Sequence, residues 1–141
     1  MDEIIEELKI YPLKRFDDDR GAVLKYVSKI SPFYNNISEV YFSKVNRGIV
    51  KGWKKHKRVK QHLVVPHGEV KLVVYDDRKK SSTYNTIQTI FIGGMDHYNL
   101  VIIPNQVFYA FQGIGIETTS LICNYIEEVH DPNESETLEI N

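Results

Sequence analysis

The sequence contains a single cysteine, Cys123, and no apolar run near the ~18 residues needed to cross a membrane. One cysteine excludes an internal disulfide and is typical of a reducing cytoplasm. The first ten residues are acidic and lack the apolar core of a secretory signal peptide. Cys123 lies in the apolar run SLICNYI, which favours a small buried residue over a nucleophile. We therefore expect a cytoplasmic protein with no membrane segment.

A large charge of one sign and the common phosphate-binding motifs are also missing. The 141-residue chain has a formal net charge of -1, so we expect no nucleic-acid partner. Glycine-rich phosphate loops and the Gly-x-Ser-x-Gly element of hydrolases do not occur. The charge is uneven, because residues 44–60 contain eight Lys or Arg and no acid, whereas residues 127–141 contain six acids and no Lys or Arg. The basic stretch is either a solvated surface or the wall of a site for an anionic small molecule.

Short apolar runs separated by turn signals make up most of the chain. Apolar residues are 42% and charged residues 26% of the sequence, which is typical of a globular protein, and the length fits one domain over residues 1–141. Val, Ile, Tyr, Phe and Thr dominate the runs, and Val70, Leu72 and Val74 alternate as on one face of a strand. We predict strands at residues 22–27, 38–45, 48–53, 61–65, 69–75, 86–92, 99–104, 106–111 and 117–126.

The connections between these runs are rich in Gly, Pro, Asn and Asp. We expect turns there, together with a short helical turn within residues 2–9. The acidic C-terminal tail, after about residue 132, is expected to be loose or to pack on a partner. Nine or ten short strands without a long helix predict an all-β fold, either an antiparallel barrel or a two-sheet jelly roll.

Four segments follow one another at ordered spacings: DDDRG (17–21), KGWKKHKRVKQHLVVPHGEVKLVVYDDR (51–78), LVIIPNQVFYAF (100–111) and NYIEEVHDPNESE (124–136). Together they resemble small cupins that act on nucleotide-linked 4-keto-6-deoxyhexoses, in two branches: the dTDP-4-dehydrorhamnose 3,5-epimerases and the 3,4-ketoisomerases. The resemblance spans residues 8–136 and implies a cupin jelly-roll barrel of antiparallel strands. It also implies a homodimer that needs no cofactor and acts on a dTDP- or CDP-linked sugar, in the synthesis of surface polysaccharides such as the O-antigen of lipopolysaccharide.

The basic stretch departs from the pattern of this family. The epimerases have Arg-Gly-x-His there and the ketoisomerases Arg-Gly-x-His-x-His, whereas this chain has Lys-Gly-Trp-Lys-Lys-His at 51–56. Lys51 replaces the arginine, Lys54 replaces the first histidine, which is the usual base, and His56 matches the second. Because alternate residues of a strand share a face, Lys54 and His56 should both point into the barrel. Metal-binding cupins need both histidines, so we expect no metal centre.

Other family positions also differ. The histidine of the family's Ile-Pro-x-Gly-x-x-His element is Tyr109 here, and Gln61 replaces a lysine, as it does in the ketoisomerases. No tyrosine lies within residues 128–132, where the epimerases have their catalytic acid. Their late aspartate, which supports the base, has no counterpart. The resemblance therefore predicts the scaffold but does not supply the usual catalytic set.

His56 is the best candidate for a base. A 4-keto group acidifies the hydrogens at C3 and C5, and epimerisation there needs a base, an acid and a group that stabilises the enolate oxygen. The reference pKa of histidine is about 6.5, and the neighbouring cations favour its neutral form. Lys54 could act as a base when neutral, or stabilise the enolate or a phosphate when charged. The ordinary alternatives are a surface histidine and an exposed strand lysine.

Candidate acids and substrate-binding residues complete the predicted site. Tyr41 lies close to the position of an active-site tyrosine of the ketoisomerases, and Tyr109 is the second candidate acid; both could instead be core tyrosines with a bonded hydroxyl. The four substrate-binding candidates are the arginine of the Asp-Arg-Gly segment that contacts the nucleotide in the family and three polar residues further along: Arg20, Lys51, Gln61 and Asn124.

Three functions remain open from the sequence. The first is a nucleotide-sugar epimerase acting at C3, or at C3 and C5, of a 4-keto-6-deoxyhexose. The second is a 3,4-ketoisomerase of the same substrate class, supported by His56 and Tyr41 but not by Lys54. The third is a non-catalytic sugar-nucleotide-binding cupin, supported by the missing catalytic residues. The fold alone does not decide between them.

Overall fold

The structure of the protein, a computed structural model, describes residues 2–138, and its regular secondary structure consists of strands apart from one short 3-10 helix. The strands and the single 3-10 helix are β1 (Lys9–Pro12), β2 (Arg15–Asp18), β3 (Gly21–Leu24), β4 (Glu39–Asn46), β5 (Val50–His56), β6 (Gln61–His67), β7 (Glu69–Tyr75), β8 (Ile87–Gly93), β9 (Asn99–Ile103), β10 (Phe108–Ile114), β11 (Thr119–Ile126), η1 (Pro132–Glu134) and β12 (Ser135–Thr137).

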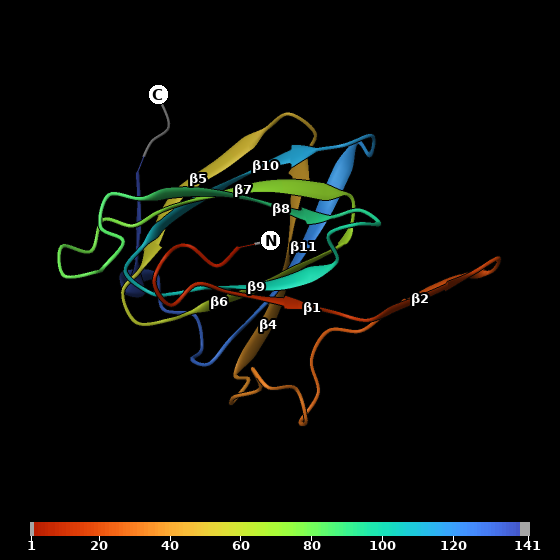
Figure 1. The fold of residues 1–141 in the computed structure, drawn as a ribbon, viewed down its shortest axis with the longest axis horizontal. Helices are drawn as coiled ribbons and strands as arrows, with labels where there is room; N and C mark the ends of the chain where they lie inside the picture. The colour runs from red at the N-terminus through yellow and green to blue at the C-terminus, as the bar shows by residue number, and fades with distance from the viewer. Residues whose placement is uncertain (1, 139–141) are drawn as a thin grey trace.

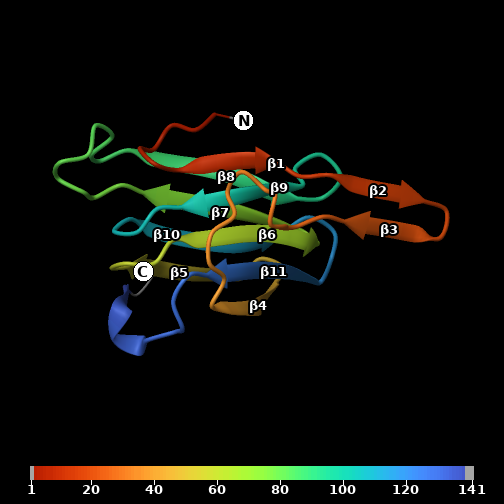
Figure 2. The same cartoon turned by 90° about the horizontal axis from the view of Figure 1, so that it is seen from below.

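Two five-stranded sheets pack face to face, with a small hairpin at one end (Figures 1 and 2). The first sheet has the order β1-β9-β6-β11-β4, the second has the order β12-β5-β10-β7-β8, and β2 pairs with β3. The strand pairs within the sheets are antiparallel. This arrangement confirms the predicted all-β class and the two-sheet jelly roll.

The main core lies between the two sheets and follows the strand alternation. Val70, Leu72 and Val74 of β7 are buried there, as their spacing predicts. Leu63 and Val65 of β6 face them from the first sheet. Burial of these branched side chains is the main stabilising contribution to the fold. Because of the same alternation, polar side chains located near the ends of the strands point into the barrel.

A second apolar layer covers the outer face of the first sheet. Tyr26, from the segment that follows β3, packs on the ring of Tyr125 and donates a 2.6 Å hydrogen bond to the backbone carbonyl of His62. Cys123 is buried in this layer, as its apolar run predicts, and burial raises the pKa of its thiol. The segment between β3 and β4 therefore packs against β6 and β11 and stabilises them.

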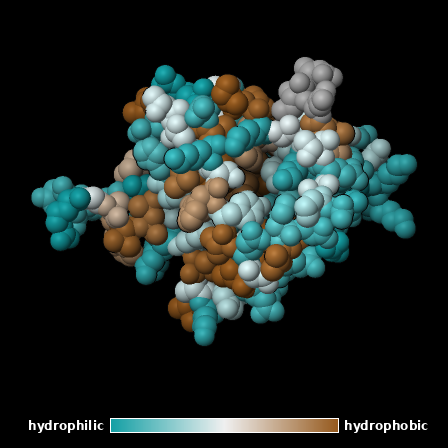
Figure 3. All heavy atoms as spheres, turned by 180° about the vertical axis from the view of Figure 1, so that it is seen from behind, coloured by the Kyte–Doolittle hydropathy of each residue, from teal (hydrophilic) through white to brown (hydrophobic). Residues whose placement is uncertain are grey.

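The hairpin of β2 and β3 projects away from the two sheets (Figure 1). Phe16 and Val23 pair across it and are 57% and 60% exposed. In the space-filling view from behind, the tip of the projection is hydrophilic, and apolar atoms gather where it joins the body (Figure 3). The hairpin thus carries an exposed apolar pair in the single chain.

Three sequence-based expectations change in the structure. The predicted helical turn near the N-terminus is a single turn, closed by a 3.0 Å bond from Leu8 N–H to the Ile5 carbonyl, and β1 follows it. The run at 22–27 is a strand only up to Leu24. The acidic tail is neither loose nor left for a partner up to residue 138, because β12 pairs with β5; residues 139–141 lie outside the described part.

Within the described part of the chain, no helix is long and apolar enough to cross a membrane.

Candidate active site

His56 ends β5 and forms the centre of three hydrogen-bonded, buried side chains. Its Nδ1 lies 2.6 Å from Glu134 Oε1, and its Nε2 lies 3.0 Å from the Tyr109 hydroxyl. Because a carboxylate only accepts hydrogen bonds, the proton sits on Nδ1, which donates to Glu134. The Nε2 of the neutral ring then accepts the hydrogen bond from Tyr109. The ring is thus fixed in the tautomer that leaves Nε2 basic.

The C-terminal segment positions Glu134. Strand β12 pairs with β5, with Ser135 opposite His56, so the residue before β12 reaches the end of β5. The second carboxylate oxygen of Glu134 accepts the backbone N–H groups of Arg58 at 2.8 Å and Val59 at 2.9 Å. Burial alone would raise the pKa of this carboxyl, but these bonds and the one from His56 together lower it. Glu134 is therefore a fixed, ionised acceptor.

The pKa values of the two rings follow from burial. Burial lowers the pKa of His56 and outweighs the opposite effect of Glu134, while the charges of Lys54 and His130 lower it further. Burial also raises the pKa of Tyr109 well above that of a free phenol. At neutral pH the histidine is therefore a neutral base, and the tyrosine is a protonated phenol.

A second polar group lies on the facing sheet. The Tyr41 hydroxyl donates to Gln61 Oε1 at 3.2 Å and accepts from Asn124 Nδ2 at 2.8 Å. Asn124 is oriented by the backbone N–H of His62, which its Oδ1 accepts at 2.7 Å. Among the described atoms, the buried Gln61 Nε2 has no hydrogen-bond partner. A buried amide donor without a partner is costly, so this group is suited to an oxygen of a bound ligand.

These groups adjoin a cavity of about 260 Å³ lined by Glu39, Tyr41, Lys54 and His130. Lys54 pairs in register with Tyr109 across β5 and β10, and its charge acts on His56, which places it beside the buried histidine. Two lining residues are joined to each other, because Glu39 accepts a hydrogen bond from the backbone N–H of His130 at 2.7 Å. The predicted residues His56, Lys54, Tyr109, Tyr41, Gln61 and Asn124 thus surround one place in the fold.

Two predicted substrate-binding residues lie elsewhere in the single chain. Arg20 is at the tip of the β2–β3 hairpin, its side chain is 86% exposed, and it pairs with Asp18. Lys51 is exposed and donates from Nζ to the backbone carbonyl of Lys44 at 2.6 Å. Neither residue lines the cavity beside His56.

Two other basic residues of the 51–62 stretch, Lys55 and Arg58, form ion pairs outside the cavity. Lys55 forms a 2.8 Å ion pair with Asp77 and lies 4.6 Å from the centre of the Phe108 ring. Arg58 pairs with Glu128 at 3.3 Å. The basic stretch is thus divided, with Lys54 at the cavity and Lys55 and Arg58 paired outside it.

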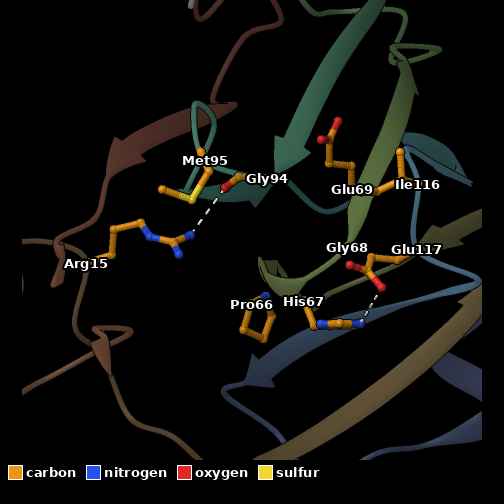
Figure 4. Close-up of a pocket in the computed structure, with 9 residues that line it drawn as sticks. All are labelled: Arg15, Pro66, His67, Gly68, Glu69, Gly94, Met95, Ile116 and Glu117. Atoms are coloured by element: carbon orange, nitrogen blue, oxygen red, sulfur yellow. Dashed lines mark hydrogen bonds and ion pairs between the residues drawn. The ribbon is translucent and has the colours of Figure 1, made fainter. Parts of the chain in front are cut away.

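A second cavity, of about 310 Å³, lies at the opposite end of β6 from Gln61 (Figure 4). Arg15 there donates to the Gly94 carbonyl at 3.4 Å, and His67 Nε2 lies 3.5 Å from Glu117. This cavity lacks a buried base held by a carboxylate, so the catalytic assignment stays with the His56 end.

Sequence reasoning missed Glu134 and His130. The expectation that the base would lack a supporting carboxylate is wrong, because Glu134 takes that role from a position 78 residues after His56. No periodicity distinguishes Glu134 from the other acids of the C-terminal stretch. The local signal was Asp131-Pro132, a pattern typical of a helix start, which indicates an ordered turn at that point.

The arrangement is suited to proton transfer. It offers a neutral imidazole with a fixed tautomer, a phenol bonded to it, a cation beside the cavity and an amide donor without a partner. No group of three or more His, Cys, Asp or Glu in residues 2–138 is arranged to hold a metal ion.

Comparisons with known proteins agree with the fold and identify the family. The profile of the dTDP-4-dehydrorhamnose 3,5-epimerase family matches residues 2–141. The chain is 31% identical to the probable low-salt glycan biosynthesis epimerase Agl13 of Haloferax volcanii over 130 residues, which are 90% of this chain and 81% of that protein. It is 24% identical to the spore coat polysaccharide biosynthesis protein SpsL of Bacillus subtilis over 131 residues, or 93% of this chain and 85% of that protein.

A solved structure extends this agreement to three dimensions. The crystal structure of a dTDP sugar isomerase from Desulfovibrio desulfuricans G20 superposes with a TM-score of 0.92 at 34% identity, covering 96% of this chain and 85% of that one. The resemblance read from the sequence is thereby confirmed, together with the epimerase class of activity that it implied. The chain belongs to the dTDP-4-dehydrorhamnose 3,5-epimerase family.

Proposed function

We propose that the protein is a cofactor-independent epimerase of a nucleotide-linked 4-keto-6-deoxyhexose, acting at C3 or at both C3 and C5. The observation that carries this proposal is the buried Glu134–His56 pair beside a polar cavity. It supplies a base of fixed tautomer, which removal of a hydrogen next to a ketone requires. The family assignment and the polysaccharide roles in the relatives' names support surface-polysaccharide sugar synthesis as the setting, with the O-antigen of lipopolysaccharide as its finer form.

Each residue of the proposed site has its own role in the reaction. His56 is the base that takes up a proton when the carbon beside the ketone loses one, and the negative charge moves onto the ketone oxygen. Lys54, in the cavity, stabilises that oxygen or a phosphate oxygen. Gln61 Nε2 donates to an oxygen of the sugar, and Asn124 keeps Gln61 and Tyr41 in place. Tyr41, which lines the cavity, is the acid that returns a proton.

The size of the cavity assigns it to the sugar. At about 260 Å³ it lies below the roughly 300–1,000 Å³ of pockets that enclose a whole drug-sized ligand. A nucleotide would lie outside it, against the surface around the mouth. The dTDP named in the family and in the D. desulfuricans isomerase supports a dTDP-linked substrate, with a CDP-linked sugar as the alternative.

The functional form is a cytoplasmic homodimer in this proposal. The projecting β2–β3 hairpin, with the exposed pair Phe16 and Val23, provides an apolar surface for a second copy. A hairpin that reaches across a dimer would also bring Arg20 to the partner's nucleotide, which the single chain does not do. Lys51 has no such route, and its ammonium is already bonded to a backbone carbonyl.

The 3,4-ketoisomerase is a second candidate because of one observation. Tyr41 lines the cavity together with Lys54, and Tyr109, the strand partner of Lys54, is bonded to His56. A ketoisomerase needs proton shuttling on a single face of the sugar. A non-catalytic binder is less well supported, since a buried carboxylate that orients a base has no role in simple binding.

Proton NMR of the product tests the proposal. Purified protein is incubated with dTDP- and with CDP-4-keto-6-deoxyglucose, and the ring couplings of the product are measured. Inverted couplings at C3, or at C3 and C5, are expected for an epimerase, whereas a ketone that has moved to C3 identifies a ketoisomerase. Binding of either nucleotide sugar with no product would contradict both activities.

A further inference from the structure

We propose that Tyr109 is the catalytic residue that contacts the substrate proton, that His56 receives a proton only through the Tyr109 hydroxyl, and that Glu134 is a positioning residue that fixes His56. The inference rests on the proposed epimerase function and deepens it. It assigns a route to the proton and adds a residue from the C-terminal segment to the machinery.

The basic nitrogen of His56 is covered by the Tyr109 hydroxyl. Its Nδ1 is bonded to Glu134, and its Nε2 lies 3.0 Å from the Tyr109 hydroxyl. The two rings are nearly parallel, with an interplanar angle of 11° and centres 5.9 Å apart. The His56 side chain is buried. A substrate could therefore reach Nε2 directly only by displacing the tyrosine.

The Tyr109 side chain lies on the cavity side of its sheet. Its partner across β5 and β10 is Lys54, so both side chains leave the same face of the sheet, and Lys54 lines the cavity. Tyr109 thus lies between the buried histidine and the residues of the cavity.

The proton balance of the relay is simple. The C–H bond beside the ketone breaks, its electron pair forms the enolate, and the proton passes to the Tyr109 oxygen as that oxygen gives its own proton to His56 Nε2. Tyr109 stays neutral throughout, in keeping with the raised pKa of its phenol. The imidazolium that forms is stabilised by the ionised Glu134. For inversion, Tyr41 delivers its proton to the opposite face of the carbon as the enolate collapses to the ketone, and solvent then reprotonates Tyr41 and takes the proton from His56. No oxidant or reductant is needed.

Glu134 is held in a fixed orientation by two backbone hydrogen bonds. Its Oε2 accepts two backbone N–H groups, from Arg58 and Val59, so the carboxylate cannot turn away from His56. Gln in its place could keep its amide oxygen on those N–H groups and would then present an NH₂ to His56 Nδ1. That contact would move the imidazole proton to Nε2, and Nε2 could no longer accept from Tyr109.

The relay is tested first with Tyr109→Phe, using exchange of the substrate C3 proton in D2O as the measurement. The relay predicts a loss of exchange on the order of 10²–10⁴-fold with nucleotide-sugar binding retained. Tyr125→Phe is the matched control, because it removes a buried hydroxyl that has no hydrogen-bond partner among the described residues and lies on the outer face of β11. The control should exchange at the wild-type rate.

Glu134→Gln tests the positioning role with a readout that folding alone does not move. The ¹⁵N shifts of the His56 ring should show the proton on Nδ1 in the wild type and on Nε2 in the variant, and exchange should fall on the order of 10²–10⁴-fold, the cost of a wrong tautomer. Glu136→Gln, an exposed change on the same segment, should alter neither. The pH profile is measured for both variants, because Lys54, Tyr109, Tyr41, Glu134 and His130 all surround the ring.

The outcomes separate the relay from the function. No exchange by the wild type would overturn the epimerase itself. Exchange by the wild type and by Tyr109→Phe at the same rate would overturn the relay and leave His56 as a direct base. Exchange by Glu134→Gln with an unchanged tautomer and pH profile would remove Glu134 from the machinery.

Discussion

His56 is held between a carboxylate that favours its charged form and a buried environment that disfavours it. Burial is the larger effect, so the pKa of the ring lies below its usual value although Glu134 is 2.6 Å away. The same carboxylate determines which nitrogen bears the proton. A single side chain from the C-terminal segment therefore sets the tautomer, while burial sets the protonation state.

The first prediction concerns pH. Since His56 is the base in its neutral form and its pKa is lowered, the rate of C3 proton exchange should be level at neutral pH and fall only below about pH 6.5, the ordinary value for histidine. Initial rates measured by NMR between about pH 5 and 8 check this. A rate that keeps rising into the alkaline range would contradict it and point to Lys54 as the base.

A second prediction concerns Asp76, which is buried where β7 ends. Burial would raise its pKa, but hydrogen bonds from Arg78, Ser81 and Thr83 lower it well below the usual value. Its stabilising contribution is therefore present above about pH 4, the ordinary value of an aspartate, and is lost as the pH falls below that.

Asp76→Asn should lower the free energy of unfolding at pH 7 by about 1–3 kcal/mol, because buried donors lose a charged acceptor. Urea denaturation at neutral and acidic pH measures the difference, which should shrink in acid. Asp96→Asn, an exposed change in the turn between β8 and β9, is the control. Equal stability of the two variants at pH 7 would refute the prediction.

At the scale of secondary-structure elements, the pairing of β5 with β10 carries the site. Lys54 and His56 come from one strand and Tyr109 from the other. Gly52 allows the two strands to approach: its φ is +144°, and a Cβ there would lie 2.6 Å from Ala110 Cα. A side chain at this position meets backbone, which cannot move aside without shifting the strand pair.

Gly52→Ala should therefore destabilise the protein by at least about 2 kcal/mol, from overpacking and backbone strain together. Gly48→Ala is the matched control, because its φ is also positive, at +83°, but nothing lies within 4 Å of its added Cβ. It should cost only about 1 kcal/mol. Thermal or urea unfolding of the pair measures both, and similar losses would contradict the steric argument.

The elements also show how far sequence reasoning reaches. Long runs with clear alternation, such as β7 and β11, were predicted closely. The structure also brings the predicted residues His56 and Tyr109 into contact, while their catalytic roles stay a prediction. The short strands β1, β2 and β12 were missed, because three or four residues give too little periodicity. Glu134 was missed for a related reason: its partner is set by the pairing of β12 with β5, a contact that local pattern does not encode.

At the scale of the whole molecule, we predict that the exposed apolar surface is covered in the proposed dimer. Phe42 on the outer face of β4, the edge strand of the first sheet, is 65% exposed, and the projecting hairpin adds a second apolar surface. An exposed edge strand with apolar neighbours pairs readily with another chain. A dimer would cover this edge and would give Arg20 a site to act on.

Light scattering should therefore give twice the mass of one chain, and Phe42→Lys should shift the protein toward the monomer. Ile87→Lys, an exposed apolar position on β8 in the other sheet, is the control and should leave the dimer intact. A wild-type monomer, or dissociation by Ile87→Lys alone, would show that the dimer surface has been placed wrongly.

The central claim is that His56, held by Glu134, is the base that drives loss of a proton from the carbon next to a ketone. The most direct measurement is proton NMR in D2O with dTDP-4-keto-6-deoxyglucose, comparing the wild type with His56→Gln. The account predicts that the C3 signal disappears with the wild type and persists with the variant on the same timescale, while the variant still binds the substrate. Loss of the C3 signal at equal rates with both proteins would contradict it.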